Sequence, residues 1–371
     1  MLNRLTHLLE SGITQGLHLG AQACVMQGGR VIADIAVGEA APGVPMRPET
    51  LMLWMSAGKP VTAMGLAQLE EEGRIVLDDP VAAWLPEFAQ NGKAPITVRH
   101  LLTHTGGFRA ARFKYPQDSW EQVIAAICAA PLEPNWVTGQ SAGYHPQTSW
   151  FVLGEILRRA SGLEISDYLR ERVLDPLGMH DAWLGVPERT FDGYAAEGLI
   201  AAMPTTAISM LRPTGDTGTS RACMVVPRPG GNFLCPANQF VRFYEALRLG
   251  GALGGRRPWQ AATVAEWTRK HRIGAYDQTF RRTVDFGLGF VCDSKAHLNP
   301  GEDADEIPYG YGRHASGLAF GHSGYQSSAA FCDPAHGLVA ALCFNGYAGE
   351  SGHQARMKPL LNAIYEAAWA G

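Results

Sequence analysis

The sequence lacks the motifs that several common classes of protein need. Its seven cysteines are scattered, odd in number and free of Cys-x-x-Cys spacing, so neither a disulfide framework nor a structural zinc site is expected. The sequence also has no G-x-x-x-x-G-K-[ST] phosphate loop and no dinucleotide-binding fingerprint between a strand and a helix. These absences predict a protein without metal or other cofactor that folds in a reducing compartment.

An excess of charge of one sign is missing as well. The formal net charge of the 371 residues is −4, which provides no electrostatic footprint for nucleic acid or for an anionic membrane surface. Residues 1–16 have the pattern of an amphipathic helix and lack the apolar core and the small-residue cleavage site of a secretory signal. We therefore expect a cytoplasmic protein with no nucleic-acid and no membrane partner.

A serine and a lysine three residues apart, Ser56 and Lys59, are the most informative residues present. On a helix this spacing places both side chains on one face, so the amine can reach the hydroxyl and take its proton. An apolar run over 51–55 and a buried-helix pattern over 60–72 place Ser56 at a helix N-terminus, where free N–H groups favour negative charge. A helix cap followed by a solvated lysine would give the same short pattern.

Two further segments follow in sequence order. Tyr144 lies just before an apolar-periodic helix at 150–157, so a turn can hold it while its phenol projects into a cleft. The sequence His322-Ser323-Gly324 precedes two strand-like runs separated by a turn, which predicts an edge strand leading into a hairpin. A glycine at position 324 allows close approach of the backbone to a ligand.

In this order, the segments resemble the serine beta-lactamase and penicillin-binding-protein superfamily, specifically its class C-like branch of family VIII esterases, D-amino-acid peptidases and transesterases. The resemblance extends from about Ala21 to the C-terminal helix. Ser56 and Lys59 match the first motif, S-x-x-K, and Tyr144 alone matches the second, Y-x-N. Residues 322–324 match the third motif, which is K-T-G, or H-[ST]-G in many esterases.

The resemblance implies a role for each of these residues. Ser56 would become acylated, Lys59 would hold and deprotonate it, and Tyr144 would act as base and later protonate the leaving group. The backbone N–H groups of Ser56 and Tyr325 would form the oxyanion hole. Because a lysine acts as a base near neutral pH only when burial or a positive field lowers its pKa, we expect Lys59 to be buried beside Ser56 and Tyr144.

Two departures from the family pattern bear on the substrate. Pro146 replaces the asparagine of the second motif and offers neither a backbone N–H nor a side-chain amide. His322 replaces the lysine of penicillin-recognising members and is largely neutral at pH 7, which makes it a poor partner for a substrate carboxylate. Both departures argue against beta-lactams and D-alanyl peptides as substrates. The predicted substrate-binding residues are His322, Ser323, Gly324, His145 and Trp54.

Less specific interpretations remain open at several of these positions. His145 is either an additional acid or base or a turn histidine facing solvent, and Trp54 either lines an acyl pocket or belongs to the core. Ser323 lies in a partial G-x-S-x-G pattern, but a tyrosine occupies the last position and strands follow where a helix should. His100 and His104 have the spacing of helical metal ligands without the accompanying glutamate, so capping or packing is expected.

The predicted fold is α+β, an α/β sandwich. The resemblance implies an antiparallel sheet built from both ends of the chain, flanked by N- and C-terminal helices, with an inserted and mostly helical domain. We assign residues 1–59 and 214–371 to the sheet domain and 60–213 to the helical domain, with the active site between them. Strands are expected over 21–26, 31–38, 285–292 and within 317–344, and a closing helix over 354–370.

The leading functional hypothesis is a serine hydrolase that acts on carboxylic esters through an acyl-enzyme on Ser56. An acyltransferase or transesterase of natural-product biosynthesis would share the first half-reaction and pass the acyl group to a small-molecule alcohol or amine. A D-amino-acid amidase or peptidase and a binding protein without turnover are further alternatives. The partners would be a small-molecule acyl donor and, in the second case, an acyl acceptor; the sequence sets no oligomeric state.

Overall fold

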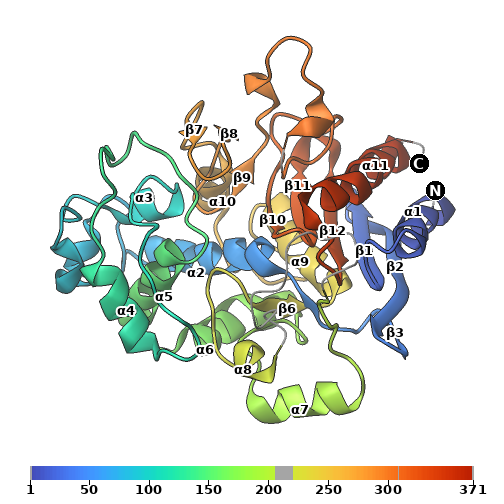
Figure 1. Cartoon of the computed structure of the whole chain (residues 1–371), viewed down its shortest axis with the longest axis horizontal. Helices are drawn as coiled ribbons and strands as arrows, with labels where there is room; N and C mark the ends of the chain where they lie inside the picture. The colour runs from blue at the N-terminus through green and yellow to red at the C-terminus, as the bar shows by residue number, and fades with distance from the viewer. Residues whose placement is uncertain (1, 205–219, 308, 370–371) are drawn as a thin grey trace.

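The computed structural model describes residues 2–204, 220–307 and 309–369 (Figure 1). Within these residues, seven strands form one antiparallel sheet in the order β3-β2-β1-β12-β11-β10-β9. The strands are β1 (Gly20–Gln27), β2 (Arg30–Ala41), β3 (Val44–Pro45), β9 (Val291–Cys292), β10 (Phe320–Gly324), β11 (Ser328–Asp333) and β12 (Leu338–Phe344). The central pairing of β1 with β12 therefore joins the two ends of the chain.

Local sequence explains the hairpin that starts the sheet. Gly28 and Gly29, between β1 and β2, have φ angles of 55° and 86°. Two-residue hairpin turns of the type that matches strand twist need a positive φ at both central positions, which glycine adopts without steric cost. The turn joins the two strands that the sequence predicts over 21–26 and 31–38.

Helices cover both faces of the sheet, so its central strands are apolar on both sides. The two terminal helices, α1 (Leu2–Thr14) and α11 (Gly349–Trp369), lie side by side over one face (Figure 1). Ala23 and Val25 of β1 point to this face and belong to the core beneath the two helices. Helix α9 (Ala237–Arg248) packs on the other face, where Cys24 points. This alternation along β1 follows the two-residue period of a strand.

The second region of the molecule is mostly helical. Its helices are α2 (Lys59–Glu71), α3 (Val98–Leu102), α4 (Trp120–Ala129), α5 (Thr148–Ser161), α6 (Ile165–Leu169), α7 (Glu188–Ala196) and α8 (Arg221–Met224). Helix α2 is buried from its first residue to Leu69 because α5, α6 and the β10 side of the sheet pack around it. Gly65 permits this packing, since a Cβ there would lie 2.7 Å from a methyl group of Leu169.

Several elements cross the predicted domain boundaries. A small sheet has the order β4-β6-β5 and pairs Trp183–Leu184 (β5) with Phe233–Cys235 (β6), next to β4 (Met52–Leu53). Helix α10 (Ala261–Thr268) packs on α2, and a short hairpin of β7 (Tyr276–Asp277) and β8 (Arg282–Thr283) follows it. The two regions are therefore interleaved, and the division at residues 59 and 213 stays a prediction.

The α+β fold, with an antiparallel sheet covered by the terminal helices, is confirmed. The strand expected over 285–292 is wrong in length, because Gly287 and Gly289 form a turn that leaves only β9. The closing helix begins at residue 349, earlier than expected, and residue 370 lies outside the described part. None of the helices in the described ranges is long and apolar enough to cross a membrane.

Candidate active site

Ser56 lies in a tight turn that connects the small sheet to helix α2. The turn is a 3-10 helix, η1 (Met55–Gly58), and α2 begins directly after it at Lys59. We expected Ser56 at the N-terminus of the long helix; it precedes that helix by one short turn. Because side chains at i and i+3 eclipse one another in 3-10 geometry, the turn directs Ser56 and Lys59 toward each other. Met55 has a φ of +51°, an uncommon conformation for a non-glycine residue next to a reactive serine.

Lys59 is completely buried, and its amine has three oxygen neighbours. The Nζ atom lies 2.8 Å from Ser56 Oγ, 2.9 Å from the Pro146 carbonyl oxygen and 2.5 Å from the Gly230 carbonyl oxygen. No carboxylate among the described residues forms an ion pair with it. Burial without a counter-charge holds the pKa of Lys59 well below its usual value of 10.5.

The neutral form of this amine suits the three neighbours. A neutral amine has two N–H bonds and one lone pair, and the Pro146 and Gly230 carbonyls can only accept hydrogen bonds. If both N–H groups serve these carbonyls, the lone pair of Lys59 faces the Ser56 hydroxyl. This is the arrangement that removal of a proton from Ser56 requires.

Tyr144 is buried beside Lys59, with its ring centroid 5.3 Å from Nζ, and packing fixes this ring. The ring stacks on Phe280 with 4.8 Å between centroids, and the ring of His104 lies 4.7 Å away. Its backbone N–H donates to Asp277 Oδ1 at 3.0 Å. Burial raises the pKa of the Tyr144 phenol well above its usual value, although a hydrogen bond with Ser56 opposes the shift. At neutral pH the phenol therefore carries its proton and is better suited to donate than to accept one.

The third motif lies on β10, which packs directly against the turn that carries Ser56. Gly324 makes this approach possible, because a Cβ there would collide with Ser328 Oγ and the Trp54 carbonyl oxygen. Among the described residues, no backbone carbonyl accepts a hydrogen bond from the backbone N–H of Ser56 or of Tyr325. Both residues line the pocket, so these two N–H groups remain available for a developing oxyanion.

His322 is buried in the pocket wall, and its protonation follows from its contacts. Its Nδ1 lies 2.8 Å from the Ser323 carbonyl oxygen, which can only accept, so the ring proton is on Nδ1. Nε2 then carries the lone pair and has no partner among the described residues. Burial lowers the pKa of His322 to about 3. The neutral histidine predicted from the sequence agrees with this environment.

Three predicted substrate-binding residues do not line the pocket: Gly324, which packs against the Trp54 carbonyl, and the buried residues His145 and Trp54. His145 is buried, with Nε2 accepting from the Gly107 N–H at 3.3 Å and Nδ1 2.8 Å from Thr148 Oγ1, so both ring nitrogens are engaged. Trp54 donates from Nε1 to the Cys235 carbonyl at 2.7 Å and belongs to the core. The structure corrects the substrate-binding prediction for all three residues, and the alternative of a solvent-facing His145 is wrong as well.

The two histidines with metal-like spacing are structural. Thr97 donates its backbone N–H to Nδ1 of His100 at 3.1 Å, as part of a capping box at the start of α3. The backbone N–H of His145 donates to Nδ1 of His104 at 3.1 Å, and His104 is completely buried. The predicted capping and packing roles are confirmed.

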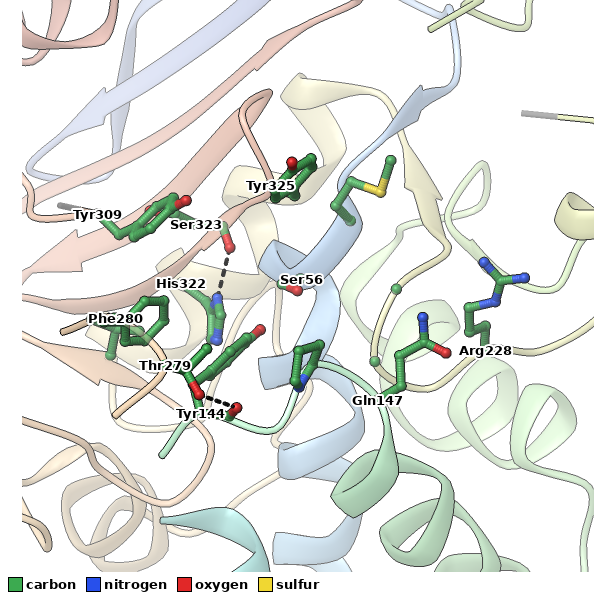
Figure 2. A pocket seen from close by; sticks show the side chains of 15 residues that line it. Ser56, Tyr144, Gln147, Arg228, Thr279, Phe280, Tyr309, His322, Ser323 and Tyr325 are labelled. Atoms are coloured by element: carbon green, nitrogen blue, oxygen red, sulfur yellow. Dashed lines mark hydrogen bonds between the residues drawn. The ribbon is translucent and has the colours of Figure 1, made fainter. Parts of the chain in front are cut away.

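Ser56 opens into a pocket of about 470 Å³, which Figure 2 shows from close by. Nine of its lining residues were not predicted from the sequence, among them Gln147, Arg228, Phe280 and Tyr309. Gln147 directly follows Pro146, so an amide side chain does reach the pocket beside the altered second motif. The remaining lining residues are Met55, Ser56, Tyr144, Pro146, Gly230, Gly231, Thr279, Val291, His322, Ser323 and Tyr325.

The family model described as "Beta-lactamase" matches residues 5–362. The chain belongs to the beta-lactamase family. This family member is 27% identical to "Esterase EstB" of Burkholderia gladioli, over 99% of this chain and 95% of EstB. It is 26% identical to "Esterase/beta-lactamase LipL" of Mycobacterium tuberculosis, over 88% of this chain and 77% of LipL.

A solved structure described as a family VIII carboxylesterase is similar over 99% of this beta-lactamase family member and 97% of that chain. The TM-score is 0.80 and the sequence identity is 26%. With these relatives, the chain falls in the esterase branch of the serine beta-lactamase and penicillin-binding-protein superfamily, and it is an enzyme.

Proposed function

We propose that the protein hydrolyses carboxylic esters through an acyl-enzyme formed on Ser56. The observation that carries this proposal is the environment of Lys59, whose buried amine lies 2.8 Å from Ser56 Oγ while two backbone carbonyls fix its direction. An unactivated serine is a weak nucleophile, and an amine with a lowered pKa is the base that it needs. The names of EstB and LipL, both esterases, support the same assignment.

Acylation uses the proposed groups in a fixed order. Neutral Lys59 takes the Ser56 hydroxyl proton as Oγ attacks the ester carbonyl carbon, and the carbonyl oxygen becomes an oxyanion between the N–H groups of Ser56 and Tyr325. Each such donor is worth on the order of 10²–10³ in rate. When the C–O bond to the leaving group breaks, the Tyr144 phenol gives its proton to the departing oxygen and regains one from the Lys59 ammonium.

Deacylation repeats these steps with water as the nucleophile. Water attacks the acyl carbonyl, its proton passes to the Lys59 and Tyr144 pair, and Ser56 Oγ leaves with a proton restored. An alcohol or amine in place of water would give acyl transfer by the same steps. We therefore treat transfer as an outcome of the experiment below.

The altered motifs support a substrate other than a beta-lactam or a D-alanyl peptide. His322 is neutral and buried at the position where penicillin-recognising members have a lysine, so the third motif offers no cation for a carboxylate. Pro146 uses its only hydrogen-bonding group, the carbonyl, to hold Lys59. Neither residue can make the contact that the family asparagine or lysine would make with such substrates.

Intact-protein mass spectrometry with 4-nitrophenyl acetate tests the proposal, with Ser56→Ala as the matched variant. We expect an acetyl adduct on the wild type that clears in water, and no adduct on Ser56→Ala. An adduct that clears only after an alcohol or amine is added would identify an acyltransferase. Absence of an adduct on both proteins, together with no labelling by a fluorophosphonate, would refute the mechanism. A parallel assay with a 4-nitroanilide of a D-amino acid tests the amidase alternative.

A further inference from the structure

The pocket around Ser56 has two chemically different ends, on opposite sides of the serine in Figure 2. Aromatic rings form one end. Phe280 stacks on Tyr144, and the Tyr309 ring lies 5.5 Å from that of Phe280. The Tyr309 hydroxyl donates to Glu350 at 3.1 Å, which fixes this ring at the pocket wall. A substrate group against this end would be apolar or aromatic.

Polar and cationic side chains form the other end. Gln147 and Arg228 lie together there (Figure 2). The backbone N–H of Gly231, which also lines the pocket, donates to the Arg228 carbonyl at 2.9 Å. Arg228 is half-buried, and its Nη2 donates to the Tyr115 carbonyl at 2.8 Å, with the guanidinium 5.7 Å from the Tyr115 ring. These contacts hold the guanidinium in place without neutralising its charge.

Arg228 has no acidic partner within the described ranges, unlike the other arginine near this end. Arg109 is bound by the Glu133 carboxylate, whereas no ion pair among the described residues includes Arg228. Its Nη2 also lies 3.5 Å from Cys223 Sγ, while its buried Nε and its Nη1 have no hydrogen-bond partner in the part of the chain that the structure describes. A partly desolvated guanidinium without a counter-ion is unfavourable, and a bound anion would relieve the cost.

The charge continues beyond the pocket. An open groove shares Pro146 and Gln147 with it and is lined on its far side by Arg109, Arg112, Lys114 and Asp118. Glu133 neutralises Arg109, while Arg112 and Lys114 form no ion pair with any described residue. Positive charge therefore exceeds negative charge along the path that leads to Arg228, which attracts an anionic ligand toward this end.

We infer that the substrate is an ester that carries a carboxylate, bound by the Arg228 guanidinium with help from the Gln147 amide. This inference rests on the proposed ester hydrolysis and specifies its substrate class. The planar guanidinium matches carboxylate geometry, and a volume of about 470 Å³ holds a small molecule of this kind. The carboxylate lies at the end of the pocket opposite Phe280 and Tyr309, on a different wall from the third motif.

Two pairs of esters test the inference, each pair differing only in a free or a methyl-capped carboxylate. The first pair, the 4-nitrophenyl esters of glutaric acid and of monomethyl glutarate, places the charge in the acyl group. The second pair, 4-acetoxybenzoate and its methyl ester, places the charge in the leaving group. For the wild type we expect kcat/KM to favour the free carboxylate by about tenfold or more in one pair, and the preference to shrink at high salt.

Variants identify the residue responsible. Arg228→Gln should reduce the preference to within about twofold, since a charge-assisted contact to the carboxylate is lost. Arg221→Gln is the matched control, because Arg221 pairs with Glu188 and Asp192 outside the pocket and its loss should leave the preference unchanged. The ratio compares two esters on one protein preparation, so a partly unfolded variant affects both esters equally.

Each result separates this inference from the proposed function. Turnover of the methyl-capped esters without a preference in either pair would overturn the carboxylate inference and leave ester hydrolysis standing. A preference that survives in Arg228→Gln would overturn the assignment to Arg228. Failure of all four esters to acylate Ser56 would overturn both proposals.

Discussion

Replacement of Lys59 with methionine tests the central chemical claim, that a neutral buried amine deprotonates Ser56. Methionine keeps an unbranched side chain of similar length and removes the base. A positioned general base contributes about 10²–10⁴ in rate. We therefore expect acylation of Lys59→Met to slow by that factor, with the pocket otherwise intact.

The structure also sets the effect of this substitution on stability. The Gly230 carbonyl is buried and loses its hydrogen bond from Lys59, at a cost of about 1–3 kcal/mol. The contact at the Pro146 carbonyl is only partly buried, so water can replace part of what is lost there. Removal of a desolvated amine acts in the opposite direction. The net change in the free energy of unfolding near neutral pH should therefore be small compared with the loss of rate.

The pH dependence of stability separates a neutral Lys59 from a charged one. In the unfolded chain Lys59 binds its proton up to about its usual pKa of 10.5, while in the folded protein its pKa is well below that value. Between these two values only the unfolded state holds the proton, so the free energy of unfolding rises with pH by about 1.4 kcal/mol per unit. Lys59→Met lacks this contribution to the slope.

Two measurements test these expectations. Single-turnover release of 4-nitrophenol gives the acylation rate, and urea unfolding between about pH 7 and 10 gives the slope of the free energy of unfolding. Lys358→Met, on α11 and away from the pocket, is the matched control and should retain both rate and slope. Acylation of Lys59→Met within tenfold of wild type would refute Lys59 as the base. Loss of acylation with an unchanged slope would instead show that Lys59 is charged in the folded protein.

Three further predictions follow from the structure. Tyr144→Phe should slow acylation by esters with poor alkoxide leaving groups by about 10²-fold or more and affect 4-nitrophenyl esters much less, because only the former need a proton from the phenol; equal losses for both would contradict this role. Gly324→Ala should lower kcat by about 10–10³-fold by moving β10 and the Tyr325 N–H away from Ser56, while Gly193→Ala on α7, where a Cβ meets nothing within 4 Å, should leave kcat unchanged. Acid should unfold the protein steeply in a pH titration followed by circular dichroism. Burial lowers the pKa of His18, His145, His322 and His353 from 6.5 to about 3, so each of them costs about 1.4 kcal/mol of stability per pH unit as the pH falls below 6.5. A free energy of unfolding that stays constant between about pH 6.5 and 5 would contradict the burial of these histidines.

The sequence predicted those features that depend on local geometry. A spacing of three residues brings Ser56 and Lys59 together because helical backbone fixes the distance between their side chains. The paired glycines at 28 and 29 specify a hairpin turn because few other residues adopt positive φ at both positions. Gly324 indicates close packing because the absence of a Cβ is the property that matters there.

Features that depend on distant parts of the chain were not predictable in the same way. The Gly230 carbonyl that holds Lys59 is 171 residues away in sequence, and Arg228 reaches the pocket from the same distant segment. His145 is adjacent to Tyr144 in sequence, yet the turn directs its ring into the core, toward Phe108. Neighbouring residues in an extended turn point in different directions, so adjacency to Tyr144 did not place His145 in the pocket.

Pro146 shows why the altered second motif is compatible with activity. What Lys59 requires at this position is an acceptor, and the acceptor is the backbone carbonyl, which proline retains. The side chain is therefore released from holding the lysine, and Gln147 presents an amide at the pocket between Ser56 and Arg228 (Figure 2). With proline in place of asparagine, a different side chain faces the pocket while Lys59 keeps its backbone acceptor. A protein that had become a binder without turnover would have no need to keep an uncompensated amine buried beside a serine, because that arrangement costs stability and serves the removal of a proton.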